Sequence, residues 1–416
     1  MRRVAIVYPR ANLDTVPSLI GAAEQLAEAG YAVDVFTYRR AGQPDPSFSS
    51  ANIRLRQLGV EGLADYSTAS LRSVVKRVGW LPSVARAPLV RTYNVLGAGL
   101  AGSSRLAARA RSAVVEREAA YTCVIGVDPD GLGLAHSLAR GAPLGYYSLE
   151  LLLSYELSTP ADRQLKAHER ECSQQAAFVI VQDQERGRLL AEDNALDWSR
   201  MVLVPNAPGG PARRKPERYW HTRFDLPVEA RVMIHSGSIG DWTGIDAIVG
   251  SASRWPDNWV LVIHTRFDAE SSAYVAGLRE IADPRRVYFS LKPVPRQEYD
   301  PLIDGADVGL AFYVPQSGSA FTQRNVQTIG LSSGKLAYYL RAGLPVIVNR
   351  AASIADVVDS ESLGVSVDDA DGIGAALQRV SADYARYSAG ALRFFDQYLE
   401  FNRAFDEVVQ RVDALV

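Results

Sequence analysis

Cysteine is scarce in this chain, which has 2 cysteines among 416 residues. Cys123 and Cys172 stand alone in apolar or helical surroundings, without the paired spacing of a disulfide framework or of a zinc site. We therefore expect a reducing, cytoplasmic compartment and no structural zinc.

Long apolar runs are missing as well. Nowhere do about 18 apolar residues follow one another, which argues against a membrane-spanning helix. The apolar run that follows Arg2 and Arg3 ends at Pro9 and is too short for a signal peptide. We expect it to form a buried first strand.

Neither sign of charge is in large excess, because the formal net charge is −2. This argues against a protein that binds nucleic acid through bulk electrostatics. One region, residues 67–118, is locally basic and carries Trp80 and Leu81 among its Arg and Lys residues. It either rests on an anionic membrane surface, as a peripheral contact at the inner membrane face, or forms a solvated helix face whose apolar stripe packs inward.

What the sequence does contain is a regular alternation of short β-rich runs with longer amphipathic segments, which is typical of parallel sheets with crossover helices. One such helix is predicted over 17–30, where Gly30 ends it. Strands are predicted at 4–9, 32–38, 53–58, 123–128, 143–150, 177–183, a run ending near 204, 231–237, 259–266, 286–291, 306–313, 345–349 and 364–367.

Proline, glycine and charge dominate residues 206–216, which indicates a boundary between two domains. We expect an α/β protein of two Rossmann-like doubly wound domains, 1–208 and 209–395, that face a cleft, with a C-terminal helix, 396–416, packing back on the first domain. In such sheets ligands bind outside the carboxyl ends of the strands.

The segment GLSSGKLAYYLRAGLPVIV, residues 330–348, has the features of an anion site. Ser332, Ser333, Gly334 and Lys335 bring hydroxyls, free backbone N–H groups and one ammonium to a predicted helix start, where the helix dipole also favours negative charge. The spacing differs from that of the GxxxxGK[ST] phosphate loop. The alternative is that the serines only cap the helix and that Lys335 is solvated.

This segment, together with HSGSIGDWTGID at 235–246, VPRQEYDPLIDGADVGLAFY at 294–313 and VPN at 204–206, resembles the GT-B glycosyltransferases, particularly those of glycosyltransferase family 4. The resemblance implies transfer of a hexosyl or related sugar from a nucleotide-sugar donor to a glycan, lipid-linked or small-molecule acceptor, in the synthesis of cell-surface polysaccharide or glycoconjugate. It implies a retaining reaction, no bound metal and no cofactor other than the donor itself.

Carried over to this chain, the resemblance implies that Ser332, Ser333, Gly334 and Lys335 hold the two phosphates of the donor. It also implies that backbone groups from Lys292 to Val294 contact the base, and that the turn at Gly237 and Ser238 lies against the nucleotide.

The sequence departs from the family at the two positions where family 4 carries glutamates, which are Gly330 and Tyr338 here. We expect backbone groups near Gly330, or the side chain of Asn325, to replace their sugar and ribose contacts. The basic pair expected after the first strand of the nucleotide domain is also absent. Arg266, at the end of a predicted strand, is the expected replacement, and its alternative is a surface arginine that pairs with Asp268.

Candidate catalytic residues lie at the ends of strands in the first domain. Glu150 is positioned to deprotonate or orient an acceptor hydroxyl, or else opens a helix in its first turn. Asp128 is the second candidate, with helix capping as its alternative. In the second domain, His235 and His264 end predicted strands, where an imidazole either donates to phosphate or sugar or is simply packed.

Two other functions remain open for this architecture. One is a sugar-nucleotide epimerase, and the other is a non-catalytic sugar-nucleotide-binding partner subunit, for which the missing glutamates and basic pair argue.

Overall fold

The computed structural model describes residues 2–40, 46–61, 121–316, 323–350 and 353–416. The basic region 67–118 singled out above lies outside the described residues. The chain divides into two compact units: Met1–Val181, Arg188–Val202 and Phe405–Val416 form the first, and Gln182–Gly187 with Leu203–Ala404 form the second.

The first unit is built on a seven-stranded sheet of order β3-β2-β1-β4-β5-β6-β7. Parallel pairing runs from β3 to β6, as expected for strands joined by crossover helices. The strand bounds are β1 (Arg3–Tyr8), β2 (Ala32–Arg40), β3 (Ile53–Glu61), β4 (Cys123–Val127), β5 (Leu144–Tyr147), β6 (Phe178–Val181) and β7 (Met201–Leu203).

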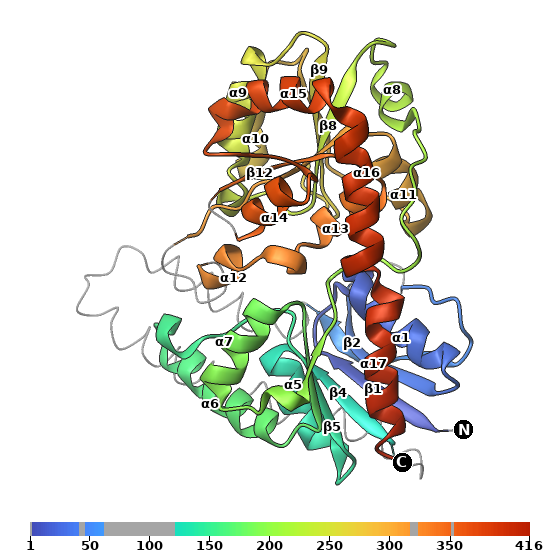
Figure 1. The fold of residues 1–416 in the computed structure, drawn as a ribbon. Coiled ribbons are helices and arrows are strands. Elements are labelled where there is room, and N and C mark those ends of the chain that lie inside the picture. Colours follow the sequence, from blue (N-terminus) through green and yellow to red (C-terminus); the bar gives the residue numbers. More distant parts are fainter. Residues whose placement is uncertain (1, 41–45, 62–120, 317–322, 351–352) are drawn as a thin grey trace, which may run out of the picture. The chain divides into compact units, whose positions relative to one another are not determined.

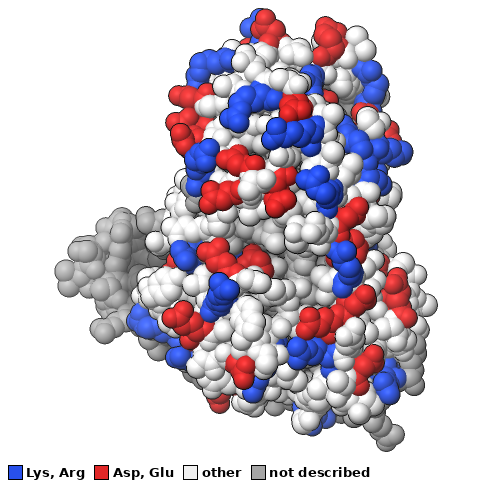
Figure 2. Space-filling view, in the orientation of Figure 1, with Lys and Arg blue, Asp and Glu red and all other residues white. Residues whose placement is uncertain are grey.

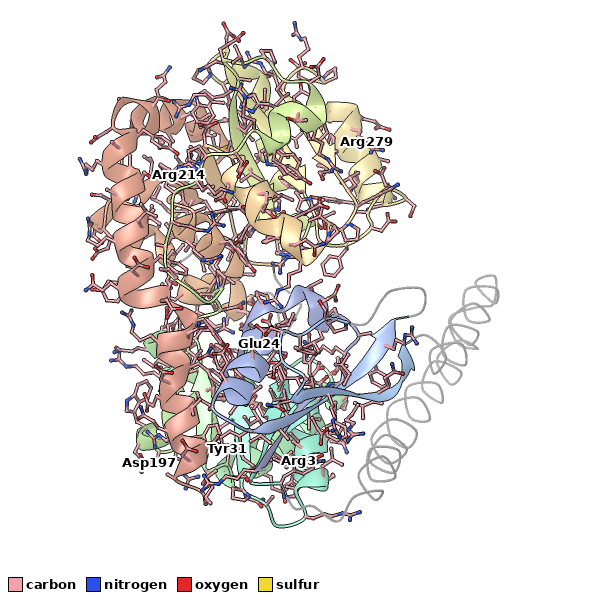
Figure 3. The ribbon with its side chains drawn as sticks, turned by 90° about the vertical axis from the view of Figure 1, so that its right-hand side faces the viewer. Arg3, Glu24, Tyr31, Asp197, Arg214 and Arg279 are labelled. Carbon is pink, nitrogen blue, oxygen red and sulfur yellow. The ribbon has the colours of Figure 1, made fainter. Side chains whose placement is uncertain are left out.

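Helices α1 (Pro17–Glu28), α5 (Asp128–Ala139), α6 (Pro160–Gln174) and α7 (Gln184–Asn194) flank this sheet, together with most of α17 (Phe401–Asp413). Helix α1 ends as predicted, because Gly30 adopts a φ of 90° just beyond it. Helix α17 is tied to the unit by the buried Tyr31, whose hydroxyl donates to Asp413 Oδ1 at 2.5 Å (Figure 3).

The second unit is built on a six-stranded sheet of order β10-β9-β8-β11-β12-β13, all parallel. The strand bounds are β8 (Arg231–Ser236), β9 (Trp259–His264), β10 (Val287–Ser290), β11 (Val308–Ala311), β12 (Val346–Asn349) and β13 (Gly364–Val367). The central strands read as continuous apolar runs because both faces of the sheet are covered (Figure 1).

The helices of the second unit are α8 (Tyr219–Phe224), α9 (Ile245–Ser251), α10 (Ala273–Ile281), α11 (Arg296–Asp304), α12 (Arg324–Gln327), α13 (Gly334–Arg341), α14 (Ile354–Ser360), α15 (Ile373–Ala382) and α16 (Tyr384–Phe394). Two apolar clusters fill the unit, one centred on Trp220, Tyr339 and Phe395 and the other on Trp255 and Trp259.

Every strand predicted from the sequence is present, with its ends shifted by a few residues. Three of these ends lie next to prolines, which lack a backbone N–H: Pro9 follows β1, Pro143 precedes β5 and Pro345 precedes β12. The predicted fold class of two parallel-sheet α/β units is therefore confirmed.

Lysine and arginine are interspersed with aspartate and glutamate over the face of the molecule in Figure 2. Within the described ranges, no helix combines the length and the apolar character needed to cross a membrane.

Candidate functional site

The strand order of the second unit reverses between β8 and β11, which is where open parallel sheets bind their ligands. Gly237 follows β8 and Tyr313 follows β11 at the carboxyl ends of these two strands. The Lys335 side chain reaches both. Its Nζ lies 4.6 Å from the centroid of the Tyr313 ring, and its Cε is 3.8 Å from the point where a Cβ on Gly237 would stand. Gly237 has a φ of 156°, so this position favours glycine for its backbone conformation as well.

The loop that leads into α13 is held rigidly from several sides. Ser332 donates its backbone N–H to the Ile329 carbonyl at 2.8 Å, and its own carbonyl accepts from Asn206 Nδ2 at 3.1 Å. The Ser333 hydroxyl caps the helix, accepting from the N–H of Leu336 at 3.2 Å, and it also hydrogen-bonds the Tyr313 hydroxyl. The capping role suggested as an alternative for the serines is thus observed for Ser333.

The first turn of α13 keeps two backbone donors available. No hydrogen bond within the described part of the chain uses the N–H of Gly334 or of Lys335. A helix start with unused N–H groups attracts anions, because those groups carry the positive end of the helix dipole.

Lys335 is the basic side chain at this helix start, and only 8% of it is exposed. Burial, reinforced by the positive charge of Arg266, lowers the pKa of its ammonium to about 7. No carboxylate of the described residues forms an ion pair with Lys335. A buried lysine without an acidic partner is costly unless an anion completes the site.

Two buried histidines, His235 and His264, lie at the carboxyl ends of the neighbouring strands β8 and β9. His235 Nε2 donates to the Ser238 carbonyl at 3.0 Å, since a carbonyl can only accept, and His235 Nδ1 is buried without a hydrogen-bond partner among the described residues. His264 Nδ1 lies 3.1 Å from Ser290 Oγ, and its Nε2 has no partner in the described part of the chain. Burial lowers the pKa of His235 to about 3, assisted by Lys335, and that of His264 to about 4. Both rings are therefore neutral at physiological pH.

Aromatic side chains occupy the position of the second family glutamate. Tyr338 packs edge-on against Tyr299, with their ring centroids 4.6 Å apart. The guanidinium carbon of Arg266 lies 5.7 Å from the Tyr299 ring centroid, so Arg266 projects over this pair. The Tyr299 hydroxyl is 2.9 Å from Ser236 Oγ, which fixes the cluster to the end of β8.

The position of the first family glutamate, Gly330, lies beside a different acid. A Cβ on Gly330, whose φ is 34°, would stand 3.1 Å from Asp183 Oδ2. Asp183 in turn accepts the backbone N–H of Arg186 at 2.9 Å, at the start of α7. Both the backbone conformation and the neighbouring carboxylate favour glycine here.

The remaining predicted nucleotide contacts are not brought to the lysine as a group. Asn325 is buried on α12 and accepts from Arg186 Nη2 at 2.8 Å. Val294 is half-buried against the core in the turn between β10 and α11. Ser238 has an exposed side chain and uses its carbonyl to hold His235.

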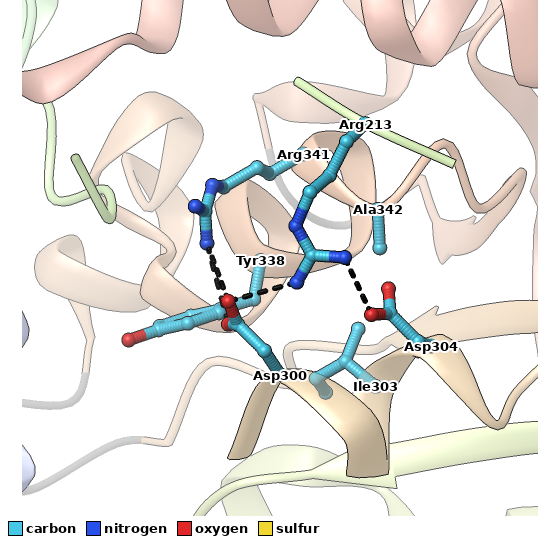
Figure 4. A pocket seen from close by; sticks show the side chains of 7 residues that line it. All are labelled: Arg213, Asp300, Ile303, Asp304, Tyr338, Arg341 and Ala342. Carbon is cyan, nitrogen blue, oxygen red and sulfur yellow. Dashed lines mark hydrogen bonds and ion pairs between the residues drawn. The ribbon is translucent and has the colours of Figure 1, made fainter. Parts of the chain in front are cut away.

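The far end of α13 is anchored by an ion-pair network around a small polar pocket (Figure 4). Arg213 Nη1 pairs with Asp304 at 2.6 Å and its Nη2 with Asp300 at 2.8 Å, while Arg341 Nη1 contacts both oxygens of Asp300 at 3.1 and 3.2 Å. The backbone N–H of Arg213 also donates to the Arg341 carbonyl at 2.8 Å. These bonds fix the segment after β7 to α11 and α13, so the site helix is held at both ends.

The first unit has its own switch point, between β1 and β4, and the predicted Asp128 lies there. Asp128 is fully buried with a φ of 57°, a left-handed conformation that is uncommon outside glycine. Its Oδ1 accepts the backbone N–H groups of Leu149 and Glu150 at 2.8 and 2.9 Å, and its Oδ2 lies 3.1 Å from Arg10 Nη1. Burial raises the pKa of Asp128 to about 7, against the opposing effect of Arg10.

These contacts give the two predicted catalytic residues, Asp128 and Glu150, different roles. Asp128 does not cap α5 with its side chain, so that alternative is wrong; it fixes the turn that carries Glu150. Glu150 has an exposed side chain in an irregular turn after β5. No helix opens at Glu150, because the following α-helix begins at Pro160, so the helix-start alternative is wrong as well.

Sequence reasoning missed Arg10 and Tyr313 as site residues. Both stand just beyond a strand that borders a switch point, β1 or β11. That position would have identified them only once the strand order was known.

The described residues contain no cluster of three or more His, Cys, Asp or Glu side chains suited to hold a metal ion.

Residues 313–401, which include the loop and α13, match the family described as glucosyltransferase 3-like, C-terminal domain. No curated protein matches the chain at a significant level.

Solved structures resemble it over its whole length. Sucrose-phosphate synthase from Thermosynechococcus elongatus is 16% identical with a TM-score of 0.66, covering 100% of this chain and 99% of that one. Anabaena HepE in complex with UDP-glucose is 12% identical with a TM-score of 0.65 and full coverage of both chains. WaaG, a glycosyltransferase involved in lipopolysaccharide biosynthesis, is 13% identical with a TM-score of 0.60 and full coverage of both chains.

At these identities the comparisons establish the fold, which is the GT-B architecture predicted from the sequence. The closer resemblance to glycosyltransferase family 4 stays a prediction.

Proposed function

We propose that this protein is a glycosyltransferase that moves a hexosyl or related sugar from a nucleotide-sugar donor to a glycan, lipid-linked or small-molecule acceptor, in the synthesis of cell-surface polysaccharide or glycoconjugate. The observation that carries the proposal is the buried Lys335 at the β8/β11 switch point, beside unused helix N–H groups and without an acidic partner among the described residues. The GT-B fold and the family match over 313–401 point to the same chemistry.

The donor site would act on the leaving group. When the bond between the anomeric carbon and the diphosphate oxygen breaks, its electron pair stays on the nucleoside diphosphate, which gains negative charge. Lys335, Arg266 and the N–H groups of Gly334 and Lys335 are preorganised donors for that charge. No metal ion is needed for this role, so we propose a metal-independent enzyme.

The first unit would supply the acceptor side. Glu150 is the group proposed to accept or orient the proton of the acceptor hydroxyl as its oxygen bonds to the anomeric carbon. Asp128 is a positioning residue, because both its oxygens are engaged in holding the Glu150 turn and Arg10.

A stability panel tests the donor site. A ligand that binds only the folded protein at 100 times its dissociation constant stabilises it by about 2.7 kcal/mol. We expect UDP, GDP or ADP, and the corresponding sugar nucleotides, to raise the melting temperature in a clear order. Lys335→Ala should fold and lose most of that increase, whereas Lys215→Ala, at an exposed lysine, should keep it. An unchanged response in Lys335→Ala would contradict the assigned site.

The absence of acids at Gly330 and Tyr338 favours one competing function, a donor-binding subunit without turnover. The two functions differ in their products: a transferase releases nucleoside diphosphate only when acceptor is present, and a binding subunit never does. An epimerase would convert the sugar nucleotide without any acceptor. Glu150→Gln should leave donor binding intact and abolish acceptor-dependent release.

A further inference from the structure

We infer that Lys335, buried in the ligand-free site without an acidic partner among the described residues, loses its proton readily and takes one up when a pyrophosphate binds, so that the site binds negative charge and a proton together. This inference rests on the proposed donor site and specifies its chemistry.

The surroundings of Lys335 explain why it would give up its charge. The groups that face it come from the ends of three strands: His235 on β8, Arg266 beyond β9 and Tyr313 beyond β11, with Ser333 on its own helix start. None of them is an acid. The Tyr313 ring face is the one favourable contact for an ammonium that the described residues provide.

The neighbouring titratable groups cannot supply the compensating charge. Burial raises the pKa of Tyr313 far above neutrality, so its hydroxyl stays protonated. His235 and His264 stay neutral for the opposite reason, since burial lowers their pKa values to about 3 and about 4. The positive charge of Arg266 is, after burial, the main cause of the lowered pKa of Lys335, at about 7.

A bound pyrophosphate reverses this balance. Two negative charges at the helix start favour the ammonium form and raise the pKa of Lys335. Between the free and bound pKa values, binding takes up a proton. Affinity is therefore flat below pH 7 and weakens by about tenfold per pH unit above it, until the pKa of the bound form is reached.

Calorimetry measures this proton directly. Binding enthalpy is determined at pH 8 in two buffers of different ionisation enthalpy, with UDP-glucose and GDP-mannose as probes. In these probes the phosphates are diesters, so they do not titrate near neutrality as the terminal phosphate of a free nucleoside diphosphate does, with a pKa of about 6. Wild-type protein should take up about 0.9 proton, the fraction of an amine of pKa 7 that is uncharged at pH 8.

Two substitutions assign the proton to its residue. Lys335→Arg keeps a permanent charge and should bind with no proton uptake, with affinity that no longer falls between pH 7 and 9. Lys335→Met should bind more weakly, also without uptake. Lys215→Arg serves as the matched control and should behave like wild type.

The outcomes separate the inference from the proposed function. Binding of a probe without proton uptake by wild type, or uptake that survives in Lys335→Arg, overturns the inference and leaves the donor site in place. Failure of every sugar nucleotide to bind overturns the proposed function and the inference with it. NMR tests the ligand-free protein: the ¹³Cε resonance of Lys335 should titrate near pH 7, and this resonance should be missing in Lys335→Met. Titration of that resonance near 10.5 would contradict the inference.

Discussion

Replacing Lys335 by methionine should stabilise the ligand-free protein, and by an amount that depends on pH. Methionine retains a similar length and apolar stem but has no charge to bury. The wild-type ammonium must be buried against Arg266 and meets no compensating acid among the described residues, which makes folding less favourable whenever the unfolded chain holds the proton.

The sign and the size of the stability difference between Lys335→Met and wild type follow from the lowered pKa of Lys335. The pKa of Lys335 falls from 10.5 to about 7 on folding, so the unfolded state binds more protons than the folded state between these values. Wild-type stability therefore rises with pH across this window. The penalty is about 4 kcal/mol at pH 7 and about 2 kcal/mol at pH 9, at about 1.4 kcal/mol per pKa unit.

The advantage of Lys335→Met over wild type should thus shrink by about 2 kcal/mol between pH 7 and pH 9. For a unit of this size that corresponds to about 4–8 °C in melting temperature. Urea unfolding followed by tryptophan fluorescence suits the test, because Trp220, Trp242, Trp255 and Trp259 all belong to the second unit.

Other groups titrate equally in both proteins and cancel in the difference. Lys215→Met, at a lysine whose side chain is 67% exposed, should show no comparable pH dependence. A stability difference that stays constant from pH 7 to pH 9 would refute the claim that Lys335 is buried without a compensating charge.

Three further substitutions test the packing of the units. Gly364→Ala would place a Cβ 1.8 Å from the Val346 carbonyl oxygen in the neighbouring strand, so it should abolish soluble folding. Gly250→Ala, in an α-helix with open space around it, should instead stabilise the protein by about 0.5–1 kcal/mol. Equal melting temperatures for the two variants would contradict this. Tyr31→Phe removes the hydrogen bond to Asp413, so it should lower the free energy of unfolding by about 1 kcal/mol and speed amide exchange in α17. Unchanged exchange in α17 would show that apolar packing alone holds the helix.

The order of strands and helices was predictable because it depends on local pattern. Runs such as VAIVY in β1 and WVLVIH in β9 are rich in β-branched and apolar residues, and a strand buried on both faces requires this wherever it lies in the sheet. Gly30 ends α1 for a reason confined to its own backbone. The helix start at Ser333 was likewise legible, because a serine before a helix supplies the acceptor that its first turn lacks.

Which partners those residues meet was decided only by the tertiary structure. A carboxylate such as that of Asp128 can cap a helix, catalyse or hold a turn, and its contacts with Leu149 and Glu150 come from the turn after β5, elsewhere in the chain. In the sequence, Lys335 is an ordinary first-turn lysine. Only the fold places Tyr313 and Arg266 beside it, without an acid among the described residues. Charge states depend on burial and on neighbours in space. At a switch point the ends of strands that are distant in the sequence lie side by side, and no short stretch of sequence encodes that arrangement.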